Sequence, residues 1–512
     1  MGGTEYAEVH LRWTIPPAVV LWLGWRRFRT RRDVSKIAAL CTIAIVSTIP
    51  WDSYLIRNKT WITSNLYTIV TKPVIHALHL PRTPKSAAAA VKIKATGGAI
   101  LLATAAYAFQ RISKGGPWTY MCLIVAWAFP FLALLWGTWV IERGTKLGLA
   151  WYGLEIEEAI FFLLTNCLVV FGMLACDYCL AVHDVSRSAS NPTLSSLAKT
   201  VVLDPRDLPH EILHNLAHSV YLLQVKSKSF YTGSILFEGR LKLDLLSLYA
   251  WCRVVDDMVD EPNPESNPAN NIAIMESYLD QIFDKDTRTP NRKQISTLLA
   301  KCTRPEQRPP FFLLPALPIS RGPLDELVEG FKTDADFDKL ADHAVPFEDD
   351  SAILHYASNV ASSVADLCCQ LVWHHYGCEL SENDQRAVLN AARQMGQALQ
   401  LTNIARDVAG DLEISRVYLP GWSTARLRAE GLEAATQDRR RLLKLARQLA
   451  QDSRGRIALL PSDVQGGMRS ATDLYMIIAN AVDQALDGGQ YSKRAGVGSW
   501  YRIKTVYKAM VA

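Results

Sequence analysis

The sequence predicts an all-α protein built from two unlike halves, and three observations support that prediction. Residues 1 to about 184 form a series of apolar runs separated by short basic or turn-like segments. Beyond residue 210, apolar residues recur at three- and four-residue spacing almost to the end, which is typical of amphipathic helices, and strand signals are few. The 512 residues also exceed one ordinary core, so we expect at least two domains.

The composition excludes several classes of protein. With 49% hydrophobic and 21% charged residues, the chain is not disordered, collagen-like or a small disulfide scaffold. The net charge of +5 comes from 55 basic and 50 acidic residues, so no nucleic-acid partner is expected. Of ten cysteines, only Cys176 and Cys179 form a C-x-x-C pair. We interpret it as a buried helical pair, and expect the soluble half to face a reducing compartment.

The first half, residues 1–184, has the pattern of a multi-helix transmembrane domain. A spanning helix needs about 20 apolar residues, and Trp118–Val140 and Ala159–Val182 each reach that length. The run at 62–80 contains Ser64, Asn65 and Lys72 and is the least apolar of the set. In order, the apolar runs are 13–25, 36–50, 62–80, 97–110, 117–140 and 150–183.

A change in composition separates the halves. Residues 185–210 are rich in Ser, Pro and Asp, as in a linker, and residues 211–512 are predicted to form one all-α domain. A proline-rich loop at 302–323 leads into a helix that begins near Leu324. The clearest helical patterns are at 241–259, 352–375, 382–409 and 438–460.

A cluster of three carboxylates lies inside the first of these helical patterns. Asp256 and Asp260 are four residues apart and therefore share a helix face, with Asp257 beside Asp260. Three such carboxylates repel one another unless a cation lies among them. The alternative is a solvated acidic patch at a helix end.

A second acidic face makes the cation interpretation stronger. Asp407 and Asp411 have the same spacing, and Asn403 lies one turn earlier on that face. Two such faces opposed across a helical bundle predict an oxygen-rich site for Mg²⁺, or alternatively Mn²⁺, which completes its shell with phosphate oxygens. The site would bind a diphosphate and stabilise its charge as it leaves. Arg253 and Arg406 are candidates to bind phosphate, or alternatively to pair with the neighbouring aspartates.

Four segments, in order and spacing, resemble those of phytoene synthases over about residues 215–505. The resemblance implies an isoprenoid-synthase-type helical fold that condenses two geranylgeranyl diphosphates head to head. Ionisation of one donor gives the cyclopropyl intermediate prephytoene diphosphate, which rearranges to phytoene in a dry cavity lined by apolar helix faces. The segments are Ser227-Lys-Ser-Phe-Tyr231, Leu248-Tyr-Ala-Trp-Cys-Arg-Val-Val-Asp-Asp-Met-Val-Asp260, Gln400-Leu-Thr-Asn-Ile-Ala-Arg-Asp407 and Arg416-Val-Tyr-Leu-Pro420.

The same resemblance implies roles for individual residues. The catalytic set would be Asp256, Asp257, Asp260, Asp407, Asp411, Arg253 and Tyr249, of which Asp256, Asp260, Asp407 and Asp411 hold the metal together with Asn403. The substrate-binding set would be Ser229, Phe230, Asn403, Arg406, Arg416 and Tyr418.

The segment Tyr356-Ala-Ser-Asn-Val-Ala-Ser-Ser-Val-Ala365 departs from the family pattern, in which glycines let the prenyl chain approach the backbone. Because Ser362 and Ala365 are still small, we expect a narrower but working pocket. Two neighbouring chemistries fit less well. A class I terpene cyclase has an Asn-x-x-x-Ser/Thr-x-x-x-Glu motif. In this sequence Asn403 is followed by Asp407 and Asp411 instead. Squalene synthase needs NADPH and usually ends in a hydrophobic anchor.

The first half resembles the lycopene cyclase domain of fungal bifunctional enzymes that fuse a cyclase to a phytoene synthase. Ionisable groups at membrane depth are functional candidates, and a carboxyl with a raised pKa can protonate lycopene to start ring closure. The alternative is that the glutamates lie at an aqueous interface. The similar segments are Thr14-Ile-Pro-Pro-Ala-Val, Ile49-Pro-Trp-Asp-Ser-Tyr-Leu-Ile-Arg57 and Gly153–Asn166, and the candidates are Asp52, Glu155, Glu157 and Glu158.

Two parts of the cyclase pattern are absent from this sequence. An Ile-Pro-x-Glu-Glu motif is missing where Trp61 runs into Ile62, and a whole spanning helix is missing where Trp136 runs into Gly137. We therefore expect an impaired cyclase on an active synthase. The alternatives are a fully bifunctional enzyme and a membrane half that acts only as an anchor or organiser for downstream carotenoid enzymes.

Topology restricts the number of spans. The cluster Arg26, Arg27, Arg29, Arg31 and Arg32 should be cytoplasmic by the positive-inside rule. The synthase must face the cytosolic supply of geranylgeranyl diphosphate, so the total number of spans is odd: one precedes the arginine cluster and an even number follows it. Six runs violate this rule and five satisfy it. We therefore predict that 62–80 does not span, and expect a multi-pass protein of the endoplasmic reticulum or another internal membrane.

Overall fold

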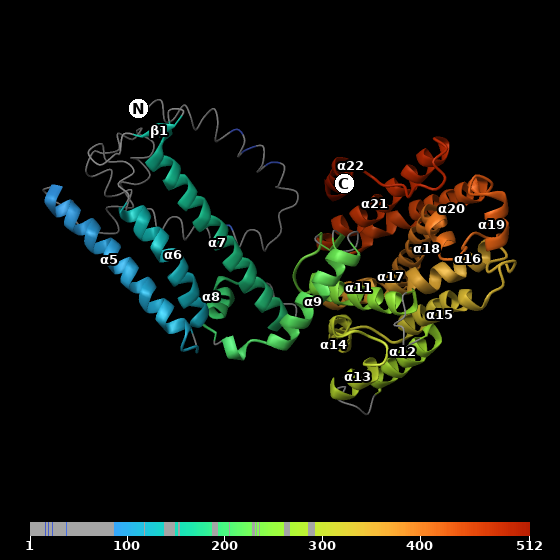
Figure 1. The fold of residues 1–512 in the computed structure, drawn as a ribbon, viewed down its shortest axis with the longest axis horizontal. Coiled ribbons are helices and arrows are strands. Elements are labelled where there is room, and N and C mark those ends of the chain that lie inside the picture. Colours follow the sequence, from blue (N-terminus) through green and yellow to red (C-terminus); the bar gives the residue numbers. More distant parts are fainter. Residues whose placement is uncertain are drawn as a thin grey trace. The chain divides into compact units, whose positions relative to one another are not determined.

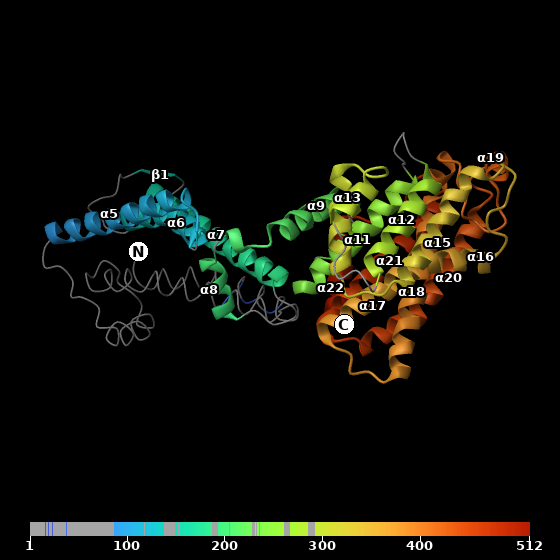
Figure 2. The ribbon, with the colours of Figure 1, turned by 90° about the horizontal axis from the view of Figure 1, so that it is seen from below.

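The chain divides into two compact units, Met1–His210 and Glu211–Ala512, which are drawn in Figures 1 and 2 and described separately below. The structure is a computed structural model. It describes residues 87–116, 118–137, 149–151, 154–186, 193–203, 205–227, 231, 233–234, 236–260, 267–284 and 292–511, with residues 16, 19, 23 and 37.

The described part of unit 1 is helical apart from one short hairpin. The hairpin pairs Ala150 with Glu155 in antiparallel register, at the start of the apolar run predicted at 150–183. The aromatic residue Trp151 favours a strand. Helix α5 packs along α6, and α8 contacts α6 and α7. The elements are α5 (Ala87–Ile112), α6 (Thr119–Gly137), β1 (Ala150–Trp151), β2 (Leu154–Glu155), α7 (Ile156–Ser186) and α8 (Leu194–Val202).

Helix α8 lies within the residues that composition assigned to a linker. Among the described residues of the chain, one stretch is long and apolar enough to cross a bilayer, Cys167–Ser186 of α7, with a mean hydropathy of 1.6. Met121–Ala133 of α6 is a shorter apolar stretch. The runs predicted at 36–50 and 62–80 lie outside the described residues except for residue 37.

Unit 2 is all-α in its described residues, which agrees with the predicted class. The patterns at 241–259 and 382–409 become single helices, whereas 352–375 is divided by a π turn. The helices are α9 (His210–Lys226), α11 (Gly239–Asp260), α12 (Pro268–Phe283), α13 (Arg292–Leu299), α14 (Pro309–Leu313), α15 (Gly322–Asp336), α16 (Asp350–Ala357), α17 (Ser363–Tyr376), α18 (Glu382–Glu413), α19 (Thr424–Glu430), α20 (Thr436–Arg454), α21 (Ser462–Asp487) and α22 (Ser499–Val511).

Two hydrophobic cores hold unit 2 together. In the first, α11 is surrounded by α12, α15 and α17, and Leu248, Trp251 and Val254 are completely buried. In the second, α18 packs on α20 and α21 through residues such as Leu401. Val360, in the π turn between α16 and α17, packs against both cores. The π turn therefore lies where the two cores meet.

The π turn, Ser358–Ser362, is closely enclosed by two helices. A Cβ atom at Gly396 of α18 would lie 2.8 Å from backbone atoms of Ala361 and Ser362, and a Cβ at Gly330 of α15 would clash with the Val360 side chain. The Ser362 hydroxyl donates to the Arg393 carbonyl of α18 at 2.6 Å. Single π turns of this kind are frequent at functional sites.

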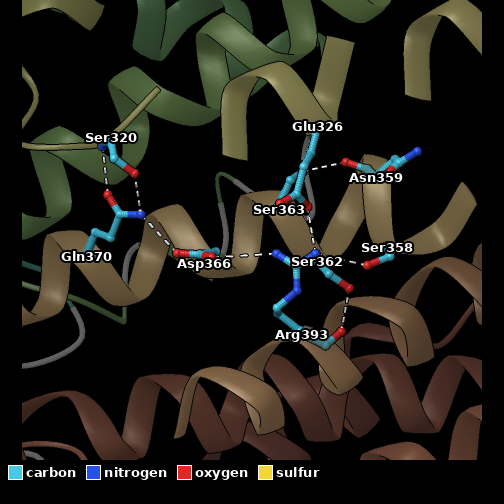
Figure 3. A network of polar contacts seen from close by, with 9 residues as sticks. All are labelled: Ser320, Glu326, Ser358, Asn359, Ser362, Ser363, Asp366, Gln370 and Arg393. Atoms are coloured by element: carbon cyan, nitrogen blue, oxygen red, sulfur yellow. Dashed lines mark hydrogen bonds and ion pairs between the residues drawn. The ribbon is translucent and has the colours of Figure 1, made fainter. Parts of the chain in front are cut away.

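A polar network also surrounds the π turn (Figure 3). The Arg393 guanidinium of α18 donates to Glu326 of α15 at 2.6 Å and to the Ser358 hydroxyl at 3.1 Å. It also lies 3.5 Å from Asp366 of α17, which accepts from Gln370 at 2.9 Å. One arginine therefore connects three helices around the turn, and this fixes how α18 is placed in the bundle.

Substitution of Gly396 by Ala should destabilise unit 2, because the added Cβ meets backbone atoms that cannot move independently. We expect a loss of about 1–3 kcal/mol, the range for overpacked cores, seen as a lower midpoint in thermal melts of the full chain followed by circular dichroism.

Gly410 on the same helix is the matched control, since a Cβ there meets no atom within 4 Å. Gly410→Ala should stabilise the helix by about 0.5–1 kcal/mol. Equal midpoints for the two variants would contradict the close packing of α18 on the π turn.

Candidate active site

The first aspartate cluster lies in the final turns of α11, whose preceding turns are anchored in the first core. Asp256 and Asp257 both accept from the Arg253 guanidinium, Asp256 at 2.9 Å. Asp257 is buried, and Lys226 lies 3.7 Å from its carboxylate. No basic residue occupies the last turn of α11. Carboxylates at a helix C-terminus face the negative end of the helix dipole, so this arrangement is unfavourable unless other charges compensate.

The second cluster occupies the end of α18 in the same way. Asp407 receives two hydrogen bonds from its neighbour Arg406, at 2.8 and 2.5 Å, and two from Arg494, at 2.8 and 3.2 Å. Two guanidinium groups therefore donate hydrogen bonds to one carboxylate. Arg494 belongs to the segment between α21 and α22 and its side chain is 73% exposed.

Arg416 connects the two clusters. Its guanidinium donates to Asp260 of α11 at 2.5 Å, and its backbone N–H donates to the Asp411 carbonyl at 2.8 Å. Ser415, immediately before it, has a φ of 61°, a left-handed conformation that turns the chain back after α18. The ends of α11 and α18 are thus brought together through one buried arginine.

A sixth acidic residue, Asp334 of α15, completes the site. One of its carboxylate oxygens accepts from the hydroxyls of Tyr356 and Tyr418, each at 2.8 Å. Burial raises the pKa of Asp334 to about 6, whereas the two tyrosine hydrogen bonds act to lower it. The rings of Tyr356 and Tyr418 stack with centroids 5.3 Å apart, and Phe337 and Phe347 pack against Tyr418.

The carboxylates influence one another electrostatically. Burial raises the pKa of Asp256 to about 7, with Asp260 as the next cause. Burial likewise raises the pKa of Asp411 to about 7, and the charges of Asp407, Asp260 and Asp334 add to it. Like charges shift each other's pKa only at short range. The two motifs and Asp334 therefore belong to one site.

The site carries more acidic than basic groups. Six carboxylates face five cationic side chains, so full ionisation leaves an excess of negative charge. Within the described ranges, no three His, Cys, Asp or Glu side chains are grouped closely enough to hold a metal ion. The carboxylates are those of Asp256, Asp257, Asp260, Asp334, Asp407 and Asp411, and the cations are Lys226, Arg253, Arg406, Arg416 and Arg494.

The structure also places the other predicted site residues. Two uses were considered for Arg253 and Arg406, phosphate binding and pairing with neighbouring aspartates, and in the structure both are paired with aspartates. The Tyr249 hydroxyl lies 3.6 Å from the Cys368 sulfur, and Asn403 shares a hydrogen bond with the Tyr475 hydroxyl of α21. Ser229 and Phe230 lie outside the described residues, as does Asp52. Glu155 ends β2 and Glu157 and Glu158 lie in the first turn of α7, where only the backbone is described.

The sequence reasoning did not identify Asp334, Arg494 or Tyr475. A signal for Asp334 exists, because Asp334, Asp336 and Asp338 place three acids within five residues, the same density as the first cluster. No comparable signal marks Arg494 or Tyr475, which reach the site only through the folding of α21 and the segment after it.

Both halves of the chain are similar to known proteins. The family described as squalene/phytoene synthase matches residues 223–498. Bifunctional lycopene cyclase/phytoene synthases from Gibberella fujikuroi and Leptosphaeria maculans are 36% and 34% identical, over 99% of this chain and 100% of each relative. The Podospora anserina protein of the same description is 32% identical over 99% of both. The first alignment spans 589 residues, more than this chain's 512, so that relative contains residues this chain lacks.

Solved structures give weaker matches. A dehydrosqualene synthase in complex with a ligand aligns with a TM-score of 0.44 and 22% identity, over 59% of this chain and 96% of that one. The squalene synthase HpnC from Alicyclobacillus acidocaldarius aligns with a TM-score of 0.41 and 19% identity, over 55% of this chain and 97% of that one.

The raised pKa values predict how stability changes with pH. A carboxyl with a higher pKa in the folded protein contributes stability that is complete below about pH 4 and is lost as the pH rises through 6 to 7. Asp334→Asn keeps an acceptor for both tyrosines but removes one charge. In thermal melts of the full chain with EDTA, this variant should gain stability relative to the natural protein between pH 5 and pH 8.

Asp336→Asn is the control for that experiment, because its carboxylate is exposed and pairs with Lys339 at 2.7 Å. Its difference from the natural protein should stay constant over the same range. A constant difference for Asp334→Asn as well would show that Asp334 is not coupled to the other carboxylates.

Proposed function

Because the chain belongs to the family of fungal bifunctional lycopene cyclase/phytoene synthases, we propose that unit 2 is a Mg²⁺-dependent phytoene synthase acting in carotenoid biosynthesis. Its reaction joins two geranylgeranyl diphosphates head to head through prephytoene diphosphate. The observation that carries this proposal is the juxtaposition of two acidic helix ends, Asp256 and Asp260 on α11 and Asp407 and Asp411 on α18, bridged by Arg416.

The residues fit a divalent cation of the magnesium type. Hard oxygen ligands dominate the site, and Mg²⁺ is usually held by one or two carboxylates together with substrate phosphate oxygens. Burial, followed by the neighbouring carboxylates, raises the pKa of Asp256 and of Asp411, so a bound cation would favour their ionised forms. When bound, the ion supplies charge neutralisation for the departing diphosphate. Asp256, Asp260, Asp407 and Asp411 would hold it, with Asn403 assisting.

The arginines provide the remaining positive charge. Arg253 and Arg406 each have an aspartate partner in the structure. A diphosphate offers oxygens of the same charge and of similar bidentate geometry. We expect these guanidinium groups, together with Arg416, to bind phosphate oxygens and hold the leaving group in place.

The aromatic residues beside Asp334 suit the other product of ionisation. Loss of diphosphate leaves an allylic carbocation, which water would quench, and the faces of aromatic rings attract cations. Tyr356 and Tyr418 are stacked and held by Asp334, and Phe347 packs on both rings. On α11 and α15, the buried residues Met258 and Phe331 add an apolar face.

For unit 1 we propose an anchored cyclase-like domain with impaired lycopene β-cyclase activity. Support comes from the missing acidic motif after Trp61 and the missing helix after Trp136. The alignment with the Gibberella fujikuroi relative is longer than this chain, which is consistent with segments missing from this chain. We place the domain in an internal membrane, with the synthase facing the cytosol and its supply of geranylgeranyl diphosphate. Among the residues that the structure describes, the apolar stretch Cys167–Ser186 is long enough to cross a bilayer and supports membrane anchoring of unit 1.

Replacing Asp256 and Asp260 together by Asn should reduce phytoene formation at least about a hundredfold, because the site then loses two carboxylates that would hold the cation that neutralises the departing diphosphate. The measurement is conversion of geranylgeranyl diphosphate by the full chain, with Mg²⁺ and with EDTA, followed by chromatography. Asp280→Asn removes an exposed carboxylate of α12 that pairs with Arg321 and should have no effect. Retained Mg²⁺-dependent turnover in the double variant would refute the site.

Expression in bacteria that accumulate lycopene tests the cyclase half. We expect lycopene to remain unchanged, while a parallel strain that makes geranylgeranyl diphosphate accumulates phytoene. Substituting Glu157 and Glu158 by Gln should then alter neither pigment. Appearance of β-carotene in the lycopene strain would show that the missing motif is dispensable and that the protein is fully bifunctional.

A further inference from the structure

The last helix of the chain, α22, packs on α21 through one of its faces. Ala509 is buried, and its carbonyl accepts from the Arg469 side chain of α21 at 3.0 Å. The Met510 side chain packs so closely on Gly466 that a Cβ there would lie 2.7 Å from the sulfur. These contacts set the rotation of α22 about its own axis, so its opposite face points away from α21.

That opposite face is apolar and aromatic. Trp500 is 78% exposed, Ile503 59% and Tyr507 49%. At 3.6 residues per turn these three side chains lie within about 60° of arc, centred about 150° from Ala509 and about 50° from Met510. Exposed apolar residues are ordinary when scattered, but a contiguous patch of large ones marks an interaction surface.

The charge around this stripe has one sign. Lys504 and Lys508 lie along one side of it, and residues 488–512 contain five Lys or Arg and no Asp or Glu. Helices with an apolar stripe containing Trp, flanked by Lys and Arg, lie in the surface of bilayers, where the cations meet anionic head groups. A protein partner fits less well, because the cores of protein interfaces are depleted of Lys.

We propose that α22 binds the surface of a bilayer that contains anionic lipids, with Trp500, Ile503 and Tyr507 among the head groups and Lys504 and Lys508 against lipid phosphates. This goes beyond the proposed catalytic function. The segment before α22 carries Arg494, which holds Asp407. Membrane contact through α22 would therefore bring Arg494, and with it the second acidic cluster, near the bilayer surface.

Photocrosslinking of the full chain tests the proposal. Ile503→p-benzoylphenylalanine and Tyr507→p-benzoylphenylalanine are reconstituted separately in vesicles of phosphatidylcholine and phosphatidylserine and irradiated. Mass spectrometry should find a phospholipid attached at both positions. Arg386→p-benzoylphenylalanine, an exposed position on α18, is the control and should give no lipid adduct. Lys504→Glu with Lys508→Glu should lower the adduct yield about tenfold, because attraction to the anionic surface is lost.

Three outcomes would overturn the proposal: crosslinks to residues 1–210 of the same chain, crosslinks to a second copy, or no adduct at either position. Both probe positions are exposed, and neither substitution changes Ala509 or Met510, the residues that pack on α21. The crosslink does not depend on turnover, so it remains informative even if the proposed synthase activity is absent.

Discussion

Repulsion between carboxylates at the facing ends of α11 and α18 is the constraint on which the rest of unit 2 depends. Both helices end in acidic residues, against the direction favoured by the helix dipole, and Asp334 adds another charge between them. Arg416 offsets part of this by bonding to Asp260 while its backbone closes the end of α18. Burial and the neighbouring carboxylates raise the pKa of Asp256 and of Asp411 to about 7, and strongly shifted pKa values cluster at functional sites.

The helical bundle holds these carboxylates together through contacts that lie away from the carboxylates themselves. The π turn between α16 and α17 is enclosed by α15 and α18, and Gly396 permits backbone contact that any Cβ would prevent. Arg393 of α18 forms ion pairs with Glu326 of α15 and Asp366 of α17. Because close-packed interiors yield little, rigid contacts at the middle of α18 fix where its last turns, and therefore Asp407 and Asp411, can lie.

The substrate and the product of the proposed reaction differ in solubility. A prenyl diphosphate has a charged head and a long apolar tail, and its condensation product has no charge left. A site with arginines and carboxylates at one end and buried apolar helix faces behind it matches the substrate, whereas only a membrane accommodates the product. The membrane anchoring that we propose for unit 1 would keep such an apolar product in lipid.

The sequence by itself determined the all-α class of unit 2, the helices α11 and α18, and the pairing of Asp256 with Asp260 and Asp407 with Asp411, because helix periodicity is a local property. It also carried the family motifs. Only the tertiary structure decided that Asp334, Tyr356 and Arg494 join the site and that the helix predicted at 352–375 is interrupted by a π turn. These features depend on contacts between residues distant in sequence, and no local pattern encodes which helices pack against one another.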